Sequence, residues 1–369
     1  MPKVNETVLE IDLGALTHNF NHLKSKLQSK TKFLAVVKAF AYGSDSIVVA
    51  KHLEKLNVDY LAVAYAKEGV LLRDAGITTP ILVLHPQPIN FKVIIDRCLE
   101  PSIYSTRVLE TFIEVAKAQS QKEYPVHIKF NTGLNRLGFK ASDIDAIVNQ
   151  LNKTRAIKVK SILSHLAASE DENERNFTEN QIKTFQSIAT DFKSKLGYSP
   201  WLHLCNTSGI INYPEGHFDM VRSGIGLYGF GNSAKEDKLL KPIACLKSVI
   251  SQMHHIEKDE TVGYNRAYTA KGVEKTATIP IGHADGITRI YGKGKGFVFI
   301  NGQKAPIIGN VCMDMIMVNV TGIDCEEGDE VVIFDGSHKA SDLAESSGTI
   351  SYEIITAISQ RVRRRILTE

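Results

Sequence analysis

Lys38 stands at the end of a short apolar run in the stretch FLAVVKAFAYG, which begins at Phe33. The run Phe33–Val37 is apolar and too short for a helix, so it predicts a buried strand. A lone lysine at a strand end is more often a surface or ion-paired side chain. Its amine becomes a nucleophile toward carbonyl groups when burial or neighbouring cations lower its pKa. Lys38 is therefore a candidate reactive group if other polar residues gather around it.

The first two-thirds of the chain alternates short apolar runs with helical patterns such as SIVVAKHLEKL, RVLETFIEVAKA and NQIKTFQSIATDFKSKL. This part holds eight strand-then-helix units, the number found in a closed (β/α)8 barrel of the α/β class. An open doubly wound sheet is usually complete with six strands, so the barrel is favoured. The predicted strands are Phe33–Val37, Tyr60–Ala64, Ile81–Leu84, Ser102–Tyr104, Val126–Phe130, Val159–Ser164, Leu202–Cys205 and Asp219–Val221.

The active site of such a barrel lies at the C-terminal ends of its strands, so the residues that follow each strand meet there. The loops after the seventh and eighth strands are the usual phosphate-binding place, and here they read NTSG and RSGIG. A lysine amine beside a phosphate cradle suits pyridoxal 5'-phosphate, which combines an aldehyde with a phosphate. The residues predicted at this face are Lys38, His85, Lys129, His165, Asn206, Thr207, Arg222, Ser223, Gly224 and Ile225.

The pattern changes after about Tyr228, where strand-like runs such as TATIPIG, GFVFING and DEVVIFDG are separated by glycine and asparagine turns. This pattern predicts a smaller, mostly β domain. We place the barrel at residues 1–235 and the second domain at residues 236–369.

Composition excludes several classes of function. The net charge of +3 is spread along 369 residues, which argues against a nucleic-acid or membrane surface. No apolar stretch reaches the length of a transmembrane helix, the N-terminus has no signal-peptide core, and no metal-ligand spacing occurs. An odd number of widely spaced cysteines suits a reduced, cytoplasmic setting. These are Cys98, Cys205, Cys245, Cys312 and Cys325.

Eight motifs follow one another along nearly the whole chain: AVVKAFAYG, HIKFNTGLNRLGF, LSHLA, LCNTSG, DMVRSGIGLYG, VGYNRAYTA, IPIGHADGITR and APIIGNVCMDMIMVNV. In these motifs and in their order the chain resembles the alanine racemase family. The resemblance implies an N-terminal (β/α)8 barrel followed by a smaller, mostly β domain, with which residues 1–10 pair. It also implies a pyridoxal-phosphate-dependent isomerase that interconverts L-alanine and D-alanine and supplies D-alanine for peptidoglycan.

The resemblance implies two catalytic bases. Lys38 would hold the cofactor covalently and act as one base, and Tyr264 would be the other, on the opposite face of the cofactor. Inversion at a carbon centre needs a proton removed on one face and returned on the other, which two opposed bases provide. The family also implies a homodimer whose active sites are shared between the two chains.

The resemblance assigns roles to the remaining site residues. Arg222 would meet the pyridine nitrogen of the cofactor and His165 its ring. Arg136 and the backbone N–H of Met313 would bind the substrate carboxylate. Lys129, often carbamylated in the family, would support Arg136, with Asp314 and His283 as further supporting residues; a tyrosine is more usual at position 283. The predicted phosphate and cofactor contacts are Tyr42, Asn206, Thr207, Gly224, Ile225 and Tyr352.

Three alternative functions stay open on the sequence alone. A racemase for a larger or more polar amino acid would keep the same bases. A barrel-type decarboxylase would carry an acidic residue at the pyridine nitrogen, and Arg222 argues against it. A carrier of pyridoxal phosphate without catalysis would lack the second domain, which this chain has together with Tyr264.

Overall fold

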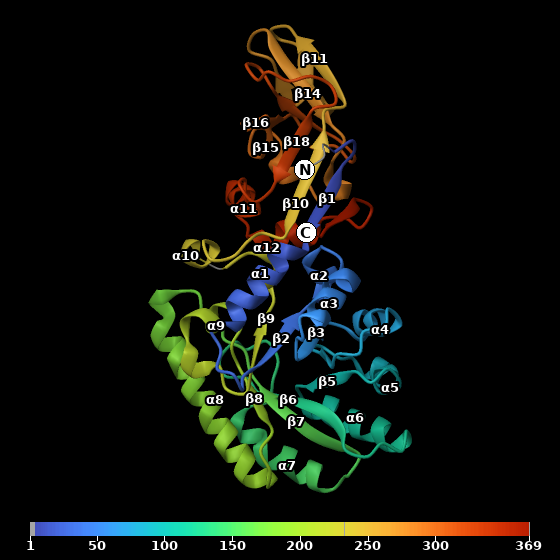
Figure 1. Cartoon of the computed structure of the whole chain (residues 1–369), viewed down its shortest axis with the longest axis vertical. Helices are drawn as coiled ribbons and strands as arrows, with labels where there is room; N and C mark the ends of the chain where they lie inside the picture. The colour runs from blue at the N-terminus through green and yellow to red at the C-terminus, as the bar shows by residue number, and fades with distance from the viewer. Residues whose placement is uncertain (1–3, 232, 369) are drawn as a thin grey trace. The chain divides into compact units, whose positions relative to one another are not determined.

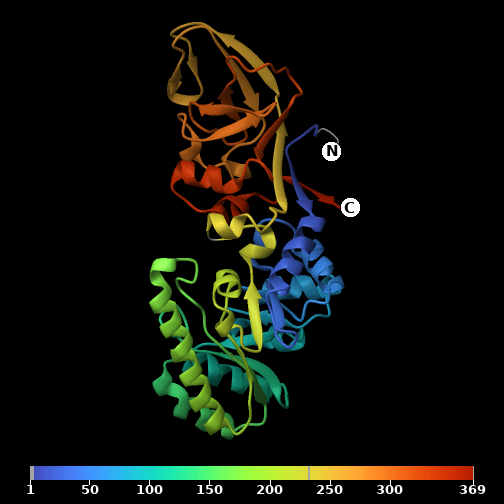
Figure 2. The same ribbon diagram turned by 60° about the vertical axis from the view of Figure 1, so that its left-hand side comes forward.

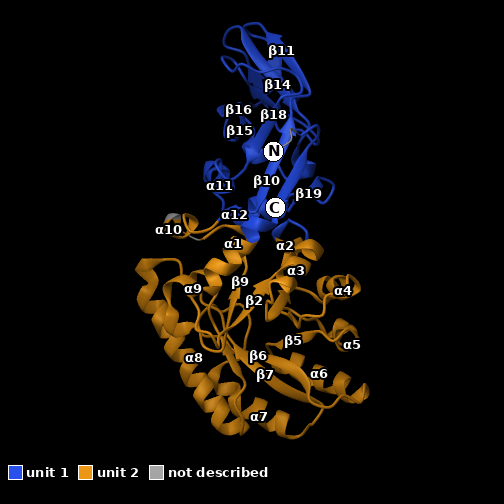
Figure 3. Ribbon diagram, viewed as in Figure 1, with its two compact units in different colours: residues 1–16, 42–45, 241–369 blue, residues 17–41, 46–240 orange. Residues whose placement is uncertain are grey.

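The computed structural model describes residues 4–231 and 233–368, and the chain divides into two compact units (Figure 3). Unit 1 comprises residues 1–16, 42–45 and 241–369, and unit 2 comprises residues 17–41 and 46–240. The chain therefore leaves unit 1 after its first strand, forms unit 2, and returns after residue 240. Residues 42–45 belong to unit 1 although they lie within the sequence of unit 2.

Unit 2 is a closed barrel of eight parallel strands, in which the last strand pairs with the first (Figure 1). All eight strands predicted from the sequence are present, with boundaries displaced by at most two residues, and the barrel prediction is confirmed. Their inner and outer faces are covered, so the strands are mostly apolar and mostly buried, with a few buried polar residues among them. The strands are β2 (Lys32–Val36), β3 (Tyr60–Val63), β4 (Ile81–Val83), β5 (Glu100–Ile103), β6 (Tyr124–Lys129), β7 (Ile157–Leu163), β8 (Trp201–His203) and β9 (Met220–Ser223).

Helices alternate with these strands, and each buries one apolar stripe. In α6 that stripe includes Val108, Leu109 and Phe112, and the helix starts where the Ser105 hydroxyl accepts a hydrogen bond from the Val108 N–H (3.4 Å). The longest helix, α8 (green in Figure 2), ends at Gly197, which has φ of 80°. The helices are α3 (Ser46–Lys55), α4 (Ala66–Asp74), α5 (Phe91–Asp96), α6 (Thr106–Ala118), α7 (Ile144–Asn152), α8 (Arg175–Leu196), α9 (Thr207–Asn212) and α10 (Ala234–Asp237).

The eighth strand-then-helix unit departs from the regular pattern. β9 is followed by the 3-10 helix η5 (Ile225–Tyr228) and later by the four-residue α10. A longer helix, α1 (Leu13–Lys24), precedes β2, and its buried Asn19 amide donates to the Leu227 carbonyl (3.1 Å). A helix from the start of the chain therefore packs at the place where the eighth helix of the barrel is expected.

Unit 1 is built on a nine-stranded sheet in the order β11-β14-β17-β16-β15-β18-β10-β1-β19. Strand β1 (Val8–Asp12) runs antiparallel to β10 and parallel to β19, so both ends of the chain enter one sheet. Figures 1 and 2 show β1 in blue beside β10 in yellow. The other strands of this sheet are β10 (Ala244–Val249), β11 (Gln252–Ile256), β14 (Glu274–Ile279), β15 (Phe297–Ile300), β16 (Gln303–Ile308), β17 (Ile316–Asn319), β18 (Glu330–Phe334) and β19 (Arg363–Leu367).

Short elements complete unit 1. A two-stranded ribbon is formed by β12 (Thr261–Val262) and β13 (Tyr268–Thr269), and two helices, α11 (Ala340–Ser347) and α12 (Ser351–Ala357), precede β19. Within the described ranges, no helix combines the length and apolar character needed to cross a bilayer. The same residues hold no cluster of three or more potential metal ligands.

Candidate functional site

The chain turns in an unusual way directly after β2, where Lys38 begins the short element α2 (Lys38–Tyr42). Ala39, Phe40, Ala41 and Tyr42 have φ values of 52°, 55°, 52° and 53°, in the left-handed region. Such a conformation costs an L-residue about 1–2 kcal/mol, so it persists only where other contacts impose it. One such contact comes from Glu68 of α4, whose carboxylate accepts the Ala39 N–H (2.6 Å).

Lys38 lies in a cluster of cationic side chains that come from different strand ends of the barrel. Burial and the charge of Arg136 lower the pKa of Lys38, although the carboxylate of Glu68 opposes the shift. Burial and the charges of Arg222, Arg136 and Lys38 lower the pKa of Lys129 to about 8. The structure therefore brings Lys38, Lys129, Arg136 and Arg222 close enough to repel one another.

His165, which follows β7, belongs to the same cluster. Burial and the charges of Arg222, Arg136, Lys129 and Lys38 hold its pKa well below the ordinary value, so the imidazole is neutral. His85, the other histidine predicted at this face, follows β4 and packs between Tyr65 and Tyr104, which follow β3 and β5, with ring centroids 5.8 and 5.6 Å away.

The loop that carries Arg136 returns to the end of β6 and is hydrogen-bonded to it. The Phe139 N–H donates to the Lys129 carbonyl (2.9 Å), and the Asn131 N–H donates to the Phe139 carbonyl (2.8 Å). The Asn131 side chain accepts the Asn135 N–H (3.0 Å). These bonds fix the loop at its base, while Arg136 itself is exposed and available to a ligand.

Arg222, on β9, is almost completely buried, and the protein uses both of its terminal nitrogens. Nη1 donates to Nδ1 (2.9 Å) and to the carbonyl of His203 (3.1 Å). Nη2 donates to the carbonyls of Ser164 (2.6 Å) and Leu204 (3.0 Å) and contacts Nδ1 of His165 (3.1 Å). Among the described residues no group accepts the Nε–H, which leaves that donor for a ligand. Burial lowers the pKa of Arg222 to about 10, so it stays charged at neutral pH.

The two loops predicted to hold a phosphate meet in unit 2. The Thr207 hydroxyl, at the start of α9, lies 3.1 Å from the Ser223 hydroxyl and accepts the Gly226 N–H (3.3 Å). Gly224 and Ile225 are buried between these residues at the start of η5. Hydroxyl groups and backbone N–H groups are thus gathered in the small-residue loops, as a phosphate site requires.

Asn206 has a structural task in the same region. Its side-chain oxygen caps α9 by accepting the Gly209 N–H (2.9 Å), and it also accepts the Ser169 hydroxyl (2.7 Å). The oxygen of this residue therefore shapes the Thr207 loop, and its predicted contact with a cofactor stays a prediction.

Two predicted phosphate ligands, Tyr42 and Tyr352, lie together in unit 1. Their ring centroids are 6.0 Å apart, and burial raises the pKa of Tyr42. The guanidinium of Arg364 donates to the carbonyls of Gly43 (2.8 Å) and Ser44 (3.2 Å), which anchors the chain directly after Tyr42. A Cβ atom at Gly43 would lie 1.9 Å from the Ile355 carbonyl oxygen, so only glycine fits there.

Tyr264 and Met313 of unit 1 are unusually exposed for large side chains, with 73% and 59% of their surface accessible. The carbonyl of Tyr264 accepts the Asn310 amide (3.0 Å), which fixes its backbone. Within the part of the chain that the structure describes, the Met313 backbone N–H has no partner. A phenol and a backbone donor are therefore both available to a ligand.

Arg361 links two segments near Met313, those of Asp285 and Asp314, through hydrogen bonds. This role was not predicted from the sequence. The guanidinium donates to the carboxylates of Asp285 (2.6 Å) and Asp314 (2.7 Å), and these charges raise the pKa of Arg361. The adjacent His283 N–H donates to the Cys312 carbonyl (2.9 Å), and His283 itself is exposed. The partners lie 76 and 47 residues from Arg361 in sequence, so no local pattern could have revealed the contact.

Comparison with known proteins defines the class to which this architecture belongs. The model of the alanine racemase N-terminal domain matches residues 11–231, and that of the C-terminal domain matches residues 243–366. An alanine racemase of Halothermothrix orenii is 37% identical over 366 residues, which cover 97% of this chain and 96% of the relative. The chain belongs to the alanine racemase family, and the predicted resemblance is confirmed.

Solved structures give the same result. An alanine racemase of Clostridium difficile 630 superposes with a TM-score of 0.92 at 36% identity, covering 100% of this chain and 97% of that one. An alanine racemase of Bartonella henselae, with covalently bound pyridoxal phosphate, has a TM-score of 0.89 at 27% identity, covering 98% of this chain and 99% of that one. The barrel followed by a mostly β domain is therefore the fold of this family.

Proposed function

We propose that this protein binds pyridoxal phosphate and interconverts L-alanine and D-alanine with Lys38 and Tyr264 as its two bases. The observation that carries the proposal is the buried, charged Arg222, whose terminal nitrogens are held by the protein while its Nε–H is free. A decarboxylase of similar architecture needs an acidic group at that place to strengthen electron withdrawal, so the fixed cation favours the racemase.

The residues present fit the cofactor. The half-buried Lys38 and Lys129 and the exposed Arg136 repel one another, and an anionic ligand would relieve that repulsion. The hydroxyl of Thr207 and the glycine-rich loop at Gly224 suit the phosphate group. When bound, pyridoxal phosphate supplies an electron-withdrawing ring that makes the Cα–H of an attached amino acid acidic.

Each base has a defined task in this proposal. The lowered pKa of Lys38 leaves a larger fraction of its amine neutral, so it removes or returns the Cα proton on one face. The phenol of Tyr264 does the same on the other face, and its exposure leaves it accessible for that role. Arg136 and the Met313 N–H orient the substrate through its carboxylate, with Lys129, Asp314 and His283 supporting them.

The positive charge of Arg222 also limits side reactions. With the cofactor bound, the Arg222 guanidinium would donate to the ring nitrogen while keeping its own proton, which would disfavour protonation of that nitrogen and weaken electron withdrawal. Transamination and decarboxylation would then be disfavoured.

We infer a homodimer in which each site takes Lys38 from one chain and Tyr264 from its partner. Two-fold symmetry would complete both sites at once. Five free cysteines support a reduced, cytoplasmic setting. The D-alanine formed would serve peptidoglycan synthesis.

The proposed reaction can be tested with three amino acids. We expect purified protein to destroy the optical rotation of L-alanine without releasing carbon dioxide. L-Serine and L-lysine should react at least about tenfold more slowly, because the large side chains of Tyr264, Met313 and Tyr352 restrict the substrate. Faster turnover of serine would contradict the preference for alanine and would point to His283 as the residue that alters substrate preference. Release of carbon dioxide would favour a decarboxylase.

Replacement of Arg222 by glutamate should change the balance of reactions. We expect racemisation of alanine to fall about 10- to 100-fold, because hydrogen bonds to a charged group are lost in the buried site. Pyruvate formed by half-transamination, measured with lactate dehydrogenase, should rise relative to racemisation. Arg222→Lys keeps the charge and serves as the control, with thermal unfolding of both variants recorded. Equal pyruvate formation in the wild type and Arg222→Glu would remove the basis for this role.

A further inference from the structure

A chain of buried polar side chains crosses the interior of the barrel, which is otherwise apolar. Five consecutive strands, β5 to β9, each contribute one residue, and each residue is hydrogen-bonded to the next. The successive separations are 2.7, 2.6, 2.7 and 2.9 Å. All five residues are at most 7% exposed. In order, they are Glu100, His127, Ser161, His203 and Arg222.

The strand register explains why successive members of this hydrogen-bonded chain lie closer to the C-terminal ends of the barrel strands. His127 and Ser161 are direct register partners. Glu100 lies two residues before the partner of His127, and His203 lies two residues after the partner of Ser161. Arg222 again lies two residues after the partner of His203. Steps of two residues keep side chains on the same face of a strand, and the stagger of a closed barrel raises them toward its C-terminal end.

With both histidines neutral, the chemistry of the two ends sets the direction of every hydrogen bond. Arg222 can only donate, so Nδ1 of His203 must accept, and the proton of that ring is on Nε2. His203 then donates to Ser161, whose hydroxyl proton is free to donate to Nδ1 of His127. The Nε2–H of His127 finally donates to the carboxylate of Glu100, which can only accept when ionised.

The lower end of the chain is held in its ionised form. Lys160 donates to Glu100 Oε1 (3.0 Å), and the Tyr60 hydroxyl donates to Oε2 (3.1 Å). Burial acts to raise the pKa of Glu100, but the hydrogen bonds from His127 and Lys160 and the charge of Lys160 outweigh it, and the pKa is lowered. Glu100 is thus a carboxylate at neutral pH and accepts at both oxygens.

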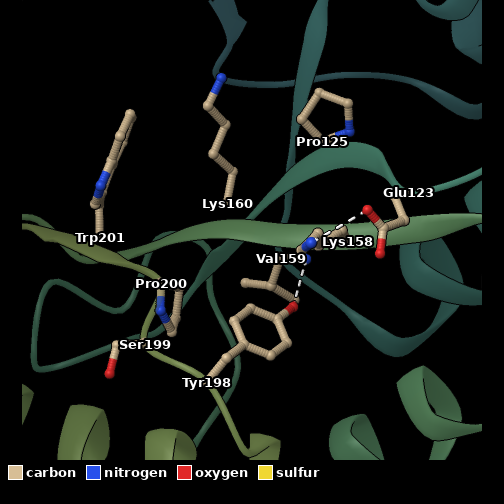
Figure 4. Close-up of a pocket in the computed structure, with 9 residues that line it drawn as sticks. All are labelled: Glu123, Pro125, Lys158, Val159, Lys160, Tyr198, Ser199, Pro200 and Trp201. Atoms are coloured by element: carbon tan, nitrogen blue, oxygen red, sulfur yellow. Dashed lines mark hydrogen bonds and ion pairs between the residues drawn. The ribbon is translucent and has the colours of Figure 1, made fainter.

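Lys160 connects this carboxylate with the solvent. It lines an open pocket of about 240 Å³ together with Glu123, Lys158, Tyr198 and Trp201 (Figure 4). Its ammonium lies 5.6 Å from the Trp201 ring centroid, and 31% of its side chain is exposed. The charge that balances Glu100 is therefore at the surface, whereas the four following members of the chain are sealed from water.

We propose that Glu100 is a positioning residue for Arg222, acting through His127, Ser161 and His203 as a one-way chain of hydrogen bonds. The chain keeps both histidines neutral and directs the lone pair of His203 at Arg222. If the link between His203 and Ser161 reversed, an N–H on Nδ1 of His203 would face an N–H of Arg222, and the guanidinium would have to move. This inference rests on the proposed function only in that Arg222 meets the cofactor.

The proposal makes a specific prediction about the charge state of His127. A histidine beside a buried carboxylate is ordinarily expected to be an imidazolium. A protonated His127 would donate to Ser161 and so reverse the link between these two residues. The one-way chain therefore requires a neutral His127 with its proton on Nε2, in spite of the contact with Glu100.

The tautomers can be read directly by nitrogen-15 NMR of histidine-labelled full-length protein carrying its cofactor. We expect His127 and His203 both to give the signal pattern of a neutral ring protonated at Nε2. Assignment uses loss of a signal pair in His127→Gln and His203→Gln. An imidazolium at His127, or a proton on Nδ1 of His203, would overturn the proposal. This readout does not depend on activity, so it stays informative if the proposed reaction is wrong.

Two variants that break the chain, and one that does not, test its effect. Ser161→Ala removes the middle link, and Glu100→Leu removes the final acceptor. Tyr60→Phe is the matched control, since it removes one hydrogen bond to Glu100 but none between Glu100 and Arg222. In both chain-breaking variants we expect the nitrogen-15 signals of His203 to move from their wild-type positions, because its Nε2–H loses its acceptor or that acceptor loses its orientation. The kcat for alanine should fall about tenfold, and KM should change less than about twofold.

The outcomes of the variant experiment separate positioning from mere stability. Tyr60→Phe should keep the wild-type tautomers and kcat, even if its melting temperature falls. Should Glu100→Leu fail to fold, Ser161→Ala decides alone, because it deletes one oxygen from the same chain. Equal losses of kcat in Ser161→Ala and Tyr60→Phe, or unchanged nitrogen-15 signals of His203 in Ser161→Ala, would disprove the positioning role.

Discussion

Lys38→Ala is expected to reduce racemisation of alanine by about 10³- to 10⁴-fold, because it removes a base that acts on the reacting carbon. Borohydride treatment of the wild-type protein should fix the cofactor to the single peptide that contains Lys38, and the variant should show no such labelling. Peptide mass spectrometry after proteolysis gives the measurement. The expectation rests on the half-buried position of Lys38 and on the cations that lower its pKa.

The matched control is Lys129→Met. Lys129 has a similar environment and also a lowered pKa, so it is the other lysine of the cluster able to react with an aldehyde. In this variant the borohydride label should remain on Lys38. Labelling of Lys129 in the wild-type protein would transfer the role of nucleophile to that residue.

Two inactive variants should restore activity when their subunits are exchanged. Lys38→Ala and Tyr264→Phe each lack one base, so the homodimer of each is inactive at both sites. A hybrid dimer with shared sites contains one doubly damaged site and one intact site. Random exchange makes about half of the dimers hybrid, so the mixture should recover about a quarter of wild-type activity.

Exchange itself has to be measured independently, with subunits that carry different affinity tags. The control mixture pairs Lys38→Ala with the double variant Lys38→Ala/Tyr264→Phe, which can form no intact site in any combination. Recovery in the test mixture but not in the control supports sharing. If hybrid dimers form and stay inactive, both bases must come from the same chain.

The sequence predicts the barrel and the strand-end residues well, because both follow from local patterns. Each barrel strand is a short apolar run, and the residue after it must lie at the same face of the barrel whatever its type. Lys38, Lys129, His165 and Arg222 could be placed together by that rule alone. The resemblance to a family was needed for Tyr264 and Met313, since nothing local distinguishes an exposed tyrosine that reacts from one that does not.

Other parts of the site depend on contacts between distant residues, and local patterns do not predict those. Glu100 and His127 read as ordinary residues of apolar strands until the barrel register places them in one hydrogen-bonded chain. Arg361 reads as a member of a basic run until Asp285 and Asp314 are placed beside it. The left-handed turn after Lys38 also leaves no signature, because alanine, phenylalanine and tyrosine ordinarily favour right-handed backbone.

The left-handed run from Ala39 to Tyr42 restricts which substitutions this stretch can tolerate. Branching at Cβ makes positive φ most unfavourable, so valine, isoleucine and threonine are excluded from four successive positions by backbone alone. Immediately upstream the rule is reversed, since β2 is an extended strand that favours branched residues. Residues before Lys38 therefore favour branched side chains, and the four residues after it exclude them. These opposite backbone requirements limit substitution around the reactive amine even where no side chain touches a substrate.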